Sequence, residues 1–482
     1  MSLSVCHLLR FIRRKIGLQI FLLPLLLAIA LSATLAQDSV RIEDLERRMR
    51  DLEQQVQALG GPGTAAPEQI AEIRRQIDVL TREIENLKLG EAAPAPERGA
   101  YGLGPAASKV YGVRRGVSLG GYGELLYENF DGSDASGAPS GREDKIDLLR
   151  LVLYFGYKFN DRILFNSELE FEHATTGEGA EEKGEVSVEF AYLDFLHSDE
   201  FNARAGLVLV PVGFINELHE PPIFLGARRP FVEQRILPTT WREIGFGVFG
   251  DAGPVTYRAY VVSSLASVGG TSSQAEGFTD QGIRGGRASG SQAAAEDFAL
   301  TGRLDFRPVG GLLLGASFFT GDTGQGRATP TGERIDGRTT LWDAHAEFRF
   351  RGIEARALYA RTSIGDVARI NAAQTAAGVL VAGDSVGERQ VGAYAEVGFD
   401  VMSLTQKRDQ ALVPYVRWER YDTQERIPAG LAADPANDVR VTTFGVAWKP
   451  IVNVALKADF NRIENEARTG VDQLNVALGF LF

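Results

Sequence analysis

The last ten residues of the chain alternate between two kinds of side chain, and this pattern constrains the fold more than any other feature. Leu474, Val476, Leu478, Phe480 and Phe482 fall on one face of an extended strand, and Gln473, Asn475, Ala477, Gly479 and Leu481 fall on the other. Successive residues of a strand point to opposite sides of a sheet. An apolar, aromatic face opposite small or polar residues is typical of a membrane strand with lipid outside and a lumen inside.

The same period of two recurs upstream in segments 149–158, 163–172 and 342–351. The first segment places on the predicted outer face Leu149, Leu151, Leu153, Phe155 and Tyr157. The third places outside Trp342, Ala344, Ala346, Phe348 and Phe350, opposite Asp343, His345, Glu347, Arg349 and Arg351. A soluble sandwich also alternates, but here Arg and Glu crowd the polar faces, and aromatic residues lie near the strand ends as in aromatic girdles.

The chain after residue 116 contains sixteen candidate strands of this kind. They span residues 117–129, 145–159, 162–173, 185–197, 201–210, 242–250, 254–264, 298–307, 311–320, 339–350, 353–362, 388–402, 411–421, 438–449, 451–461 and 472–482. Tight turns alternate with long loops between them, as expected when turns face the periplasm and loops face outward. The predicted fold is all-β, a transmembrane barrel of about 16 antiparallel strands over residues 117–482.

The N-terminus has the features of a secretory signal peptide over residues 1–36. Basic residues precede an apolar stretch from Ile16 to Leu31, and Thr34-Leu35-Ala36 offers small residues for cleavage after Ala36. The alternative is a retained membrane anchor, although the apolar stretch is short for a membrane span. The single cysteine, Cys6, would leave with this segment. The mature chain would then hold no disulfide and no thiolate metal site.

Residues 37–90 carry two apolar seams with heptad spacing. The first seam is Ile42, Leu45, Met49, Leu52, Val56 and Leu59, and the second is Ile70, Ile73, Ile77, Leu80, Ile84 and Leu87. This spacing predicts a periplasmic α-helical coiled coil between protomers, or a helical hairpin folded at the Gly-rich break at 60–63. Residues 91–116 follow as a linker rich in Pro, Gly and Ala.

The connection 211–241 differs from the other long loops. It is rich in large apolar residues and contains five prolines, whereas loop 265–297 is rich in Gly, Ser and Ala and is expected to be mobile. A loop with that much apolar surface must pack on something, so we expect it to fold into the barrel and narrow the pore. Its candidate constriction and solute-binding residues are Arg228, Arg229, Arg235, Arg242, Glu217, Glu220 and Glu233.

These charges allow two interpretations. The arginines could form a cationic rim that binds carboxylate or phosphate, or the opposite charges could pair and only pin the loop. The predicted lumen-lining arginines, Arg150, Arg204, Arg258, Arg303, Arg349, Arg356 and Arg417, could extend a basic path. Facing carboxylates such as Glu168, Glu170, Glu189 and Glu347 could cancel it.

Three stretches carry a resemblance to a known family. They are YGELLYENF (122–130), DLLRLVLYFGYKFNDRILFNSELEFEH (147–173) and GFINELHEPPIFLGARRPFVEQRILPTTWREIGFGVFG (213–250). They resemble the phosphate-selective porin O/P family and related trimeric outer-membrane porins with an N-terminal coiled coil, and the likeness covers most of 117–482. The resemblance implies a homotrimer and a preference for small anions such as phosphate or carboxylates. Unlike that family, the strands here hold few lysines and many glutamates.

Together these features predict an outer-membrane porin for passive diffusion of small hydrophilic solutes, with no catalytic residue, cofactor or metal site. The expected partners are outer-membrane lipid, small anionic solutes and the barrel-assembly machinery, for which Phe480 and Phe482 form a C-terminal signal. Peptidoglycan is a further candidate partner, and the net charge of -12 argues against nucleic acid. The alternative function is a structural tether to the cell wall through the coiled coil. A tether needs no open lumen, so conductance separates the two.

Overall fold

The computed structural model describes residues 47–48, 51–52, 99–174, 184–270, 275–405 and 410–482. The chain divides into two compact units, residues 1–91 and residues 92–482. The expected signal peptide and nearly all of the expected coiled coil lie outside the described residues, and the four described residues between 37 and 90 are helical. No helix in the described ranges is long and apolar enough to cross a membrane.

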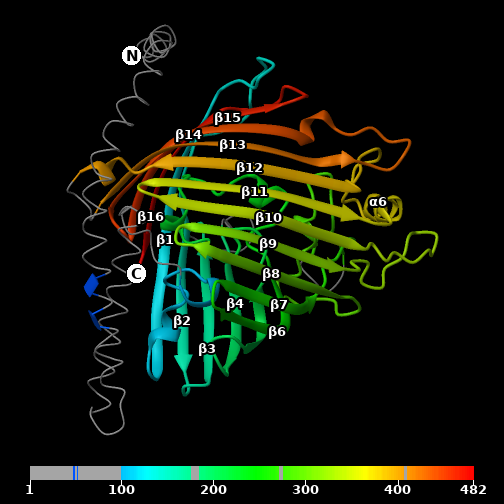
Figure 1. Cartoon of the computed structure of the whole chain (residues 1–482). Helices are drawn as coiled ribbons and strands as arrows, with labels where there is room; N and C mark the ends of the chain where they lie inside the picture. The colour runs from blue at the N-terminus through cyan, green and yellow to red at the C-terminus, as the bar shows by residue number, and fades with distance from the viewer. Residues whose placement is uncertain (1–46, 49–50, 53–98, 175–183, 271–274, 406–409) are drawn as a thin grey trace, which may run out of the picture. The chain divides into compact units, whose positions relative to one another are not determined.

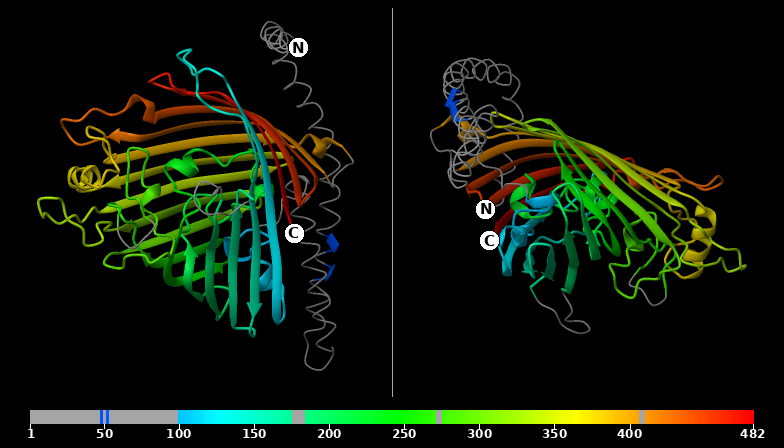
Figure 2. Two further views of the ribbon diagram at one scale, coloured as in Figure 1. Left: turned by 180° about the vertical axis from the view of Figure 1, so that it is seen from behind. Right: turned by 60° about the horizontal axis from the view of Figure 1, so that its bottom comes forward.

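Sixteen antiparallel strands close into one barrel (Figures 1 and 2). Each strand pairs with its neighbours in sequence, and β1 (Gly116–Phe130) closes the barrel on β16 (Gln473–Leu481). The strands between them are β2 (Lys145–Lys158), β3 (Ile163–Glu172), β4 (Val186–Leu196), β5 (Asn202–Leu209), β6 (Arg242–Ala252), β7 (Val255–Ser263), β8 (Phe298–Val309), β9 (Leu312–Gly321), β10 (Thr339–Phe350), β11 (Ile353–Ile364), β12 (Arg389–Phe399), β13 (Ala411–Arg426), β14 (Asp438–Ile451) and β15 (Val454–Asn465). The predicted fold class and all sixteen predicted strands are confirmed.

Short helices lie outside the strands. They are η1 (Ala100–Gly102), α4 (Lys109–Gly112), η3 (Pro221–Ile223), α5 (Val232–Arg235), η4 (Arg284–Gly286), α6 (Val367–Ala376), η5 (Val401–Leu404) and η6 (Pro435–Asn437). Tight turns and long connections alternate along the chain, so one end of the barrel carries the turns and the other carries the long loops, as the turn pattern predicted.

The last residue of the chain completes the barrel seam. In this seam β1 and β16 pair from Tyr122 opposite Leu481 to Phe130 opposite Gln473. Beyond the strand proper, the Phe482 N–H donates to the Gly121 carbonyl at 2.9 Å, and the Gly121 N–H donates to the Phe482 carbonyl at 3.0 Å. A Cβ on Gly121 would lie 2.8 Å from the Phe482 ring, so the absence of a side chain there leaves room for the ring.

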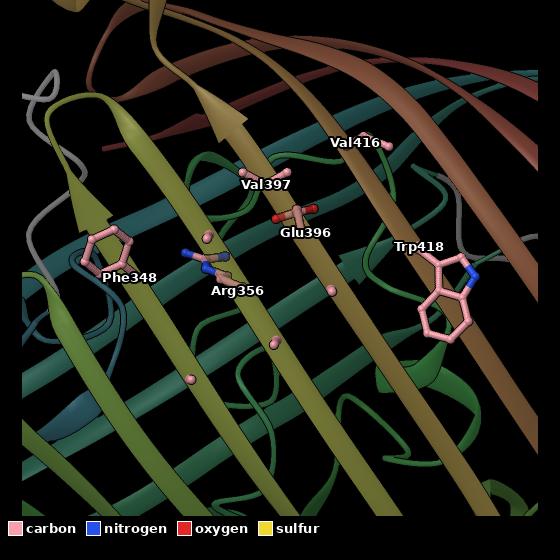
Figure 3. Close-up of a pocket in the computed structure, with 10 residues that line it drawn as sticks. Phe348, Arg356, Glu396, Val397, Val416 and Trp418 are labelled. Carbon is pink, nitrogen blue, oxygen red and sulfur yellow. The ribbon is translucent and has the colours of Figure 1, made fainter. Parts of the chain in front are cut away.

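The outer face of the barrel is apolar and the inner face is charged. Outward-facing aromatic rings such as Phe246, Phe444 and Trp418 are exposed, whereas inward-facing residues of the same strands are mostly buried. Figure 3 shows this division in a shallow hollow of about 400 Å³ across β10 to β13. Phe348, Val397 and Trp418 line the hollow, while Arg356 points to the opposite side of its strand. The hollow lies on the outer face, where it would meet lipid tails in a membrane.

A β-bulge corrects one expectation about which residues face outward. Between Glu124 and Leu125 the register of β1 with β2 shifts, so that Leu148 pairs with Leu125 and Leu149 is passed over. Leu149 was expected to face lipid, but it packs against the inward-facing cluster of Leu126, Ala227 and Ala477. One extra residue in a strand reverses the side chains beyond it, because the side-chain period is two.

Candidate functional site

Loop 211–241 enters the lumen and contacts walls on every side of it. Its residues pair with Glu168 on β3, Arg258 on β7 and Tyr394 on β12, and Pro221 packs against Gly479 on β16. A Cβ on Gly479 would lie 2.5 Å from Pro221, so this glycine permits the close approach of the loop. Loop 211–241 therefore packs against side chains inside the barrel, and its role as a constriction stays a prediction.

The main chain of the loop is held by charged side chains of the barrel wall. Three wall cations donate to loop carbonyls: Arg303 to Gly213, Arg356 to Ile223 at 3.0 Å, and Lys457 to Pro221 and Gly226 at 2.6 and 2.9 Å. Three wall carboxylates accept from loop amides: Asp343 from Gly213, Asp459 from Ala227 and Glu419 from Val232. Hydrogen bonds to charged groups contribute more than neutral ones, so these six side chains fix the path of the loop.

Two buried histidines add to this anchorage. His219 Nε2 lies 2.9 Å from Glu168, and its Nδ1 lies 3.0 Å from the carbonyl of Asn216. His345 lies between Asp343 and Asp305, with ring nitrogens 2.6 and 3.1 Å from their carboxylates. Each ring nitrogen therefore faces an oxygen of the protein. Ser317 donates to Asp343, which also faces His345.

Five of the seven expected constriction residues have an ion-pair or hydrogen-bond partner, and the other two have no carboxylate partner among the described residues. Arg228 pairs with Glu128 on β1, Arg242 pairs with Glu189 on β4, and Glu217 pairs with Arg258 at 2.9 Å. Glu233 accepts from the amide of Ile215 and the hydroxyl of Tyr394, and Glu220 accepts from backbone amides. Arg229 and Arg235 have no carboxylate partner among the described residues. The roles of all seven toward a solute stay a prediction.

Each of the seven arginines that were expected to line the lumen lies in an ion pair, and all except Arg349 are buried. Their partners are Glu124 and Glu170 for Arg150, Asp194 for Arg204, Glu217 and Asp305 for Arg258 and Arg303, Glu347 for Arg349 and Arg356, and Glu396 and Glu419 for Arg417. The wall charges are thus largely compensated. These seven arginines therefore do not form an uninterrupted basic path along the wall.

A second segment also enters the lumen. Residues 99–112, here called the N-terminal insert, lie within the expected linker and contain η1 and α4. Leu103, Ala106 and Val110 of the insert are buried. The insert approaches β7 closely at Gly102 (φ +80°), where a Cβ would lie 1.2 Å from the Arg258 guanidinium. A larger residue here would be strained by the positive φ and would displace the guanidinium group.

Polar contacts fix the insert to the wall and to loop 211–241. The amides of Ala106 and Ala107 each donate to Glu220 at 3.0 Å, and Asn166 donates to the Ala107 carbonyl at 2.8 Å. The hydroxyl of Tyr111 lies 2.5 Å from Asp194, which also pairs with Arg204. Burial raises the pKa of Glu220 to about 7, against the lowering effect of the two amides. The insert and loop 211–241 therefore meet at one buried carboxyl group.

Loop 265–297 is not the mobile loop that its composition predicted, as far as residues 265–270 and 275–297 show. Phe278 and Ile283 are fully buried in the main apolar cluster. The carbonyl of Asp280 accepts from Thr423 at 2.6 Å, and Gln374 donates to the carbonyl of Phe278 at 2.9 Å. Phe278 and Ile283, two large apolar residues in a loop of mostly small residues, were the sequence signal that could have corrected the prediction of a mobile loop.

Lys457 is the most specific positioning residue that the sequence alone did not single out. It is buried, it donates to two loop carbonyls, and its Nζ lies 3.8 Å from the centroid of the Phe224 ring. A cation over an aromatic face is stabilised when it is removed from water. The sequence pattern gave no sign that Lys457 holds the loop, because its carbonyl partners are more than 200 positions away along the chain.

We expect Lys457→Met to loosen the turn at 221–227. The substitution keeps the length of the side chain but leaves two buried carbonyls without a donor, which costs about 2 kcal/mol or more. Hydrogen exchange of the amides at 223–227 in the folded protein should become faster. Lys145→Met, at an exposed position, is the matched control. Equal exchange rates in native protein and Lys457→Met would show that the lysine does not hold the loop.

Comparison with protein families and known sequences gave one clear relative. No family model matches the chain. An uncharacterized protein of Aquifex aeolicus (strain VF5) is 37% identical over 397 residues, which are 82% of this chain and 87% of that protein. Identity at this level across most of both chains indicates common descent.

Solved structures of similar architecture include outer-membrane proteins of low sequence identity. A loop L8 deletion mutant of OmpT, an outer membrane protein of Vibrio cholerae, has a TM-score of 0.47 at 9% identity, over 77% of this chain and 100% of that one. OmpF of Salmonella typhi, in complex with daunomycin, has a TM-score of 0.47 at 11% identity, over 77% and 98%. An anion-selective porin of Comamonas acidovorans has a TM-score of 0.44 at 13% identity, over 76% and 98%. The resemblance to the phosphate-selective porin O/P family stays a prediction.

Proposed function

The chain belongs to the same family as the Aquifex aeolicus protein, and from its barrel we propose that it is an outer-membrane porin for passive diffusion of small hydrophilic solutes. One observation carries this proposal: a closed sixteen-strand barrel that is apolar outside and charged inside. Such a barrel matches a lipid bilayer on its outer face. Barrels of this strand number are wide enough to hold an aqueous path, whereas eight strands are filled by side chains.

The proposed solute path runs past loop 211–241. On the long-loop side of it, Arg235 and Arg284 are exposed and Glu172 is half-buried. On the tight-turn side, Arg349 and Glu354 are half-buried on inward-facing positions. Between these two levels the lumen is narrowed by the loop and by the N-terminal insert. Solutes would therefore be selected at the loop rather than along the wall.

We propose a preference for small anions such as phosphate or carboxylates. The wall arginines are paired, so unpaired charge near the path comes from the inserted loops, and loop 211–241 contributes Arg229 and Arg235 to it. Bulk water screens poorly inside a narrow lumen, so a few fixed charges there outweigh the net surface charge of -12. Selectivity should follow these arginines and not the overall charge of the protein.

Reversal potentials across a planar bilayer under a salt gradient test this proposal. We expect the native channel to be weakly anion-selective and Arg228→Ala/Arg229→Ala/Arg235→Ala to lose that preference. Removal of Arg228 also leaves Glu128 uncompensated, which adds to the change. Arg334→Ala/Arg338→Ala, at exposed loop positions, is the control. A cation-selective native channel would contradict the anion preference, and unchanged selectivity in the triple variant would show that the loop is not the filter.

A second candidate function is a structural tether between the outer membrane and peptidoglycan through residues 37–90. The dense packing of the lumen by the insert and loop 211–241 favours it, because a tether needs no open path. Conductance decides between the two: a purified protein that inserts into bilayers without opening channels would support the tether.

In either case we propose a homotrimer that the barrel-assembly machinery places in the outer membrane, with the N-terminal segment in the periplasm.

A further inference from the structure

Four arginines near the proposed path differ from those of the wall. Arg229 and Arg235 come from loop 211–241, and Arg284 and Arg287 come from loop 265–297. No carboxylate pairs with any of the four among the described residues, whereas all seven wall arginines are paired. The four unpaired guanidinium groups therefore come from two loops that are separate in sequence.

The two loops are joined by the arginines themselves. Arg284 donates to the carbonyl of Thr239, and Arg287 donates to the carbonyls of Thr240 and Pro238. The Nε of Arg287 also donates to the carbonyl of Arg284 at 3.1 Å. A Cβ on Gly282 would lie 2.9 Å from the carbonyl of Arg235, so the loops also approach closely there. Carbonyl partners orient a guanidinium group without neutralising its charge.

The positive charges are close enough to act on one another. Burial, and then the charges of Arg287, Arg229 and Arg235, lower the pKa of Arg284 to about 9, while Glu172 acts in the opposite direction. Arg284 is nevertheless exposed and Arg287 is half-buried, so water reaches both side chains. Like charges gathered in a confined space repel, and an anion between them would relieve that repulsion.

Arg229 provides the independent sign of a missing ligand. Its relative exposure is 9%, and neither its Nε nor its Nη2 has a hydrogen-bond partner. An unpartnered buried donor is costly, and more so when it is charged. Its charge also lowers the pKa of Arg284, as do the charges of Arg287 and Arg235. Arg229 thus has unused donors within electrostatic range of Arg284.

The chemistry of the cluster limits what it can bind. A guanidinium group presents N–H donors in a planar fork that matches carboxylate, phosphate or sulfate oxygens. Four such groups would be poorly compensated by a monovalent ion such as chloride. We infer that Arg229, Arg235, Arg284 and Arg287 form a binding site for a small oxyanion that carries two or more negative charges. This site deepens the proposed function and rests on it for its place along the solute path.

Isothermal titration calorimetry of the full-length protein in detergent tests the site without reference to conduction. Sodium sulfate and sodium citrate are the probes, in a background of sodium chloride, and they compare a compact with an extended oxyanion. The test variant is Arg284→Gln/Arg287→Gln, which removes both arginines of loop 265–297. Loss of a charge-assisted hydrogen bond weakens binding roughly tenfold, so we expect roughly 100-fold weaker binding of the preferred probe.

The matched control is Arg334→Gln/Arg338→Gln, which removes the same charge from side chains that are 73% and 61% exposed in the loop between β9 and β10. Unchanged affinity in this control together with the loss in the test variant supports the site. Equal affinities in native protein and test variant, or equal losses in both variants, would overturn it. A native protein that conducts but binds neither probe would also overturn the site and leave the porin standing. A native protein that binds but does not conduct would support the site and overturn the porin.

Discussion

Removal of the N-terminal insert should raise the single-channel conductance. The insert fills part of the lumen at the tight-turn end and is held there by Glu220, Asn166 and Asp194. Conductance follows the open cross-section of a pore, so we expect it to be roughly doubled when residues 37–112 are deleted behind the signal peptide. Glu220 would lose both of its amide donors, and water entering the vacated space would hydrate it.

A shorter deletion provides the control for this experiment. Deleting residues 37–98 removes the expected coiled coil but keeps the insert, so the conductance should remain that of the native channel. Both variants should keep a folded barrel, because all sixteen strands lie after residue 115. Conductance that rises equally in both variants would assign the effect to residues 37–98. Conductance that rises in neither would show that the insert does not obstruct the path.

Loss of Phe482 should strongly reduce the amount of assembled barrel. Its main chain makes two hydrogen bonds with Gly121 across the seam, and its ring packs over that glycine. Deletion removes both bonds and the aromatic contact, which together contribute about 2–4 kcal/mol at the step that closes the barrel. We expect at least roughly 30-fold less heat-modifiable protein in outer-membrane fractions, since each 1.4 kcal/mol corresponds to a factor of ten.

Two substitutions separate the contributions of the ring and the main chain. Phe482→Tyr keeps an aromatic ring and should assemble normally, whereas Phe482→Asp keeps the main-chain bonds but places a charge at the lipid-facing end of β16. We expect Phe482→Asp to resemble the deletion. Normal levels of folded protein in Phe482→Asp would contradict both the seam argument and the proposed assembly signal.

The strands could be predicted from the sequence because their signal is local. The alternation of apolar and polar residues along a strand can be recognised without knowing any distant partner. Ten residues were therefore enough to predict β16. The same rule failed at Leu149, because a bulge depends on how two strands align and not on the pattern within one of them. Loop 211–241 could be assigned to the lumen on composition, since its apolar residues needed a surface to cover.

The sequence by itself therefore determined the number of strands, the order of turns and loops, and which loop is inserted. Only the tertiary structure decided which charges are free. Lys457 meets Pro221 across 236 positions and Ala227 meets Asp459 across 232, and pairs this distant leave no periodic trace along the chain. Arg303 and Arg229 look alike in the sequence, yet the first is neutralised by Asp305 and the second is not. Electrostatic pairing depends on distances of a few ångströms, and these distances are set only when the barrel closes around its two inserted segments.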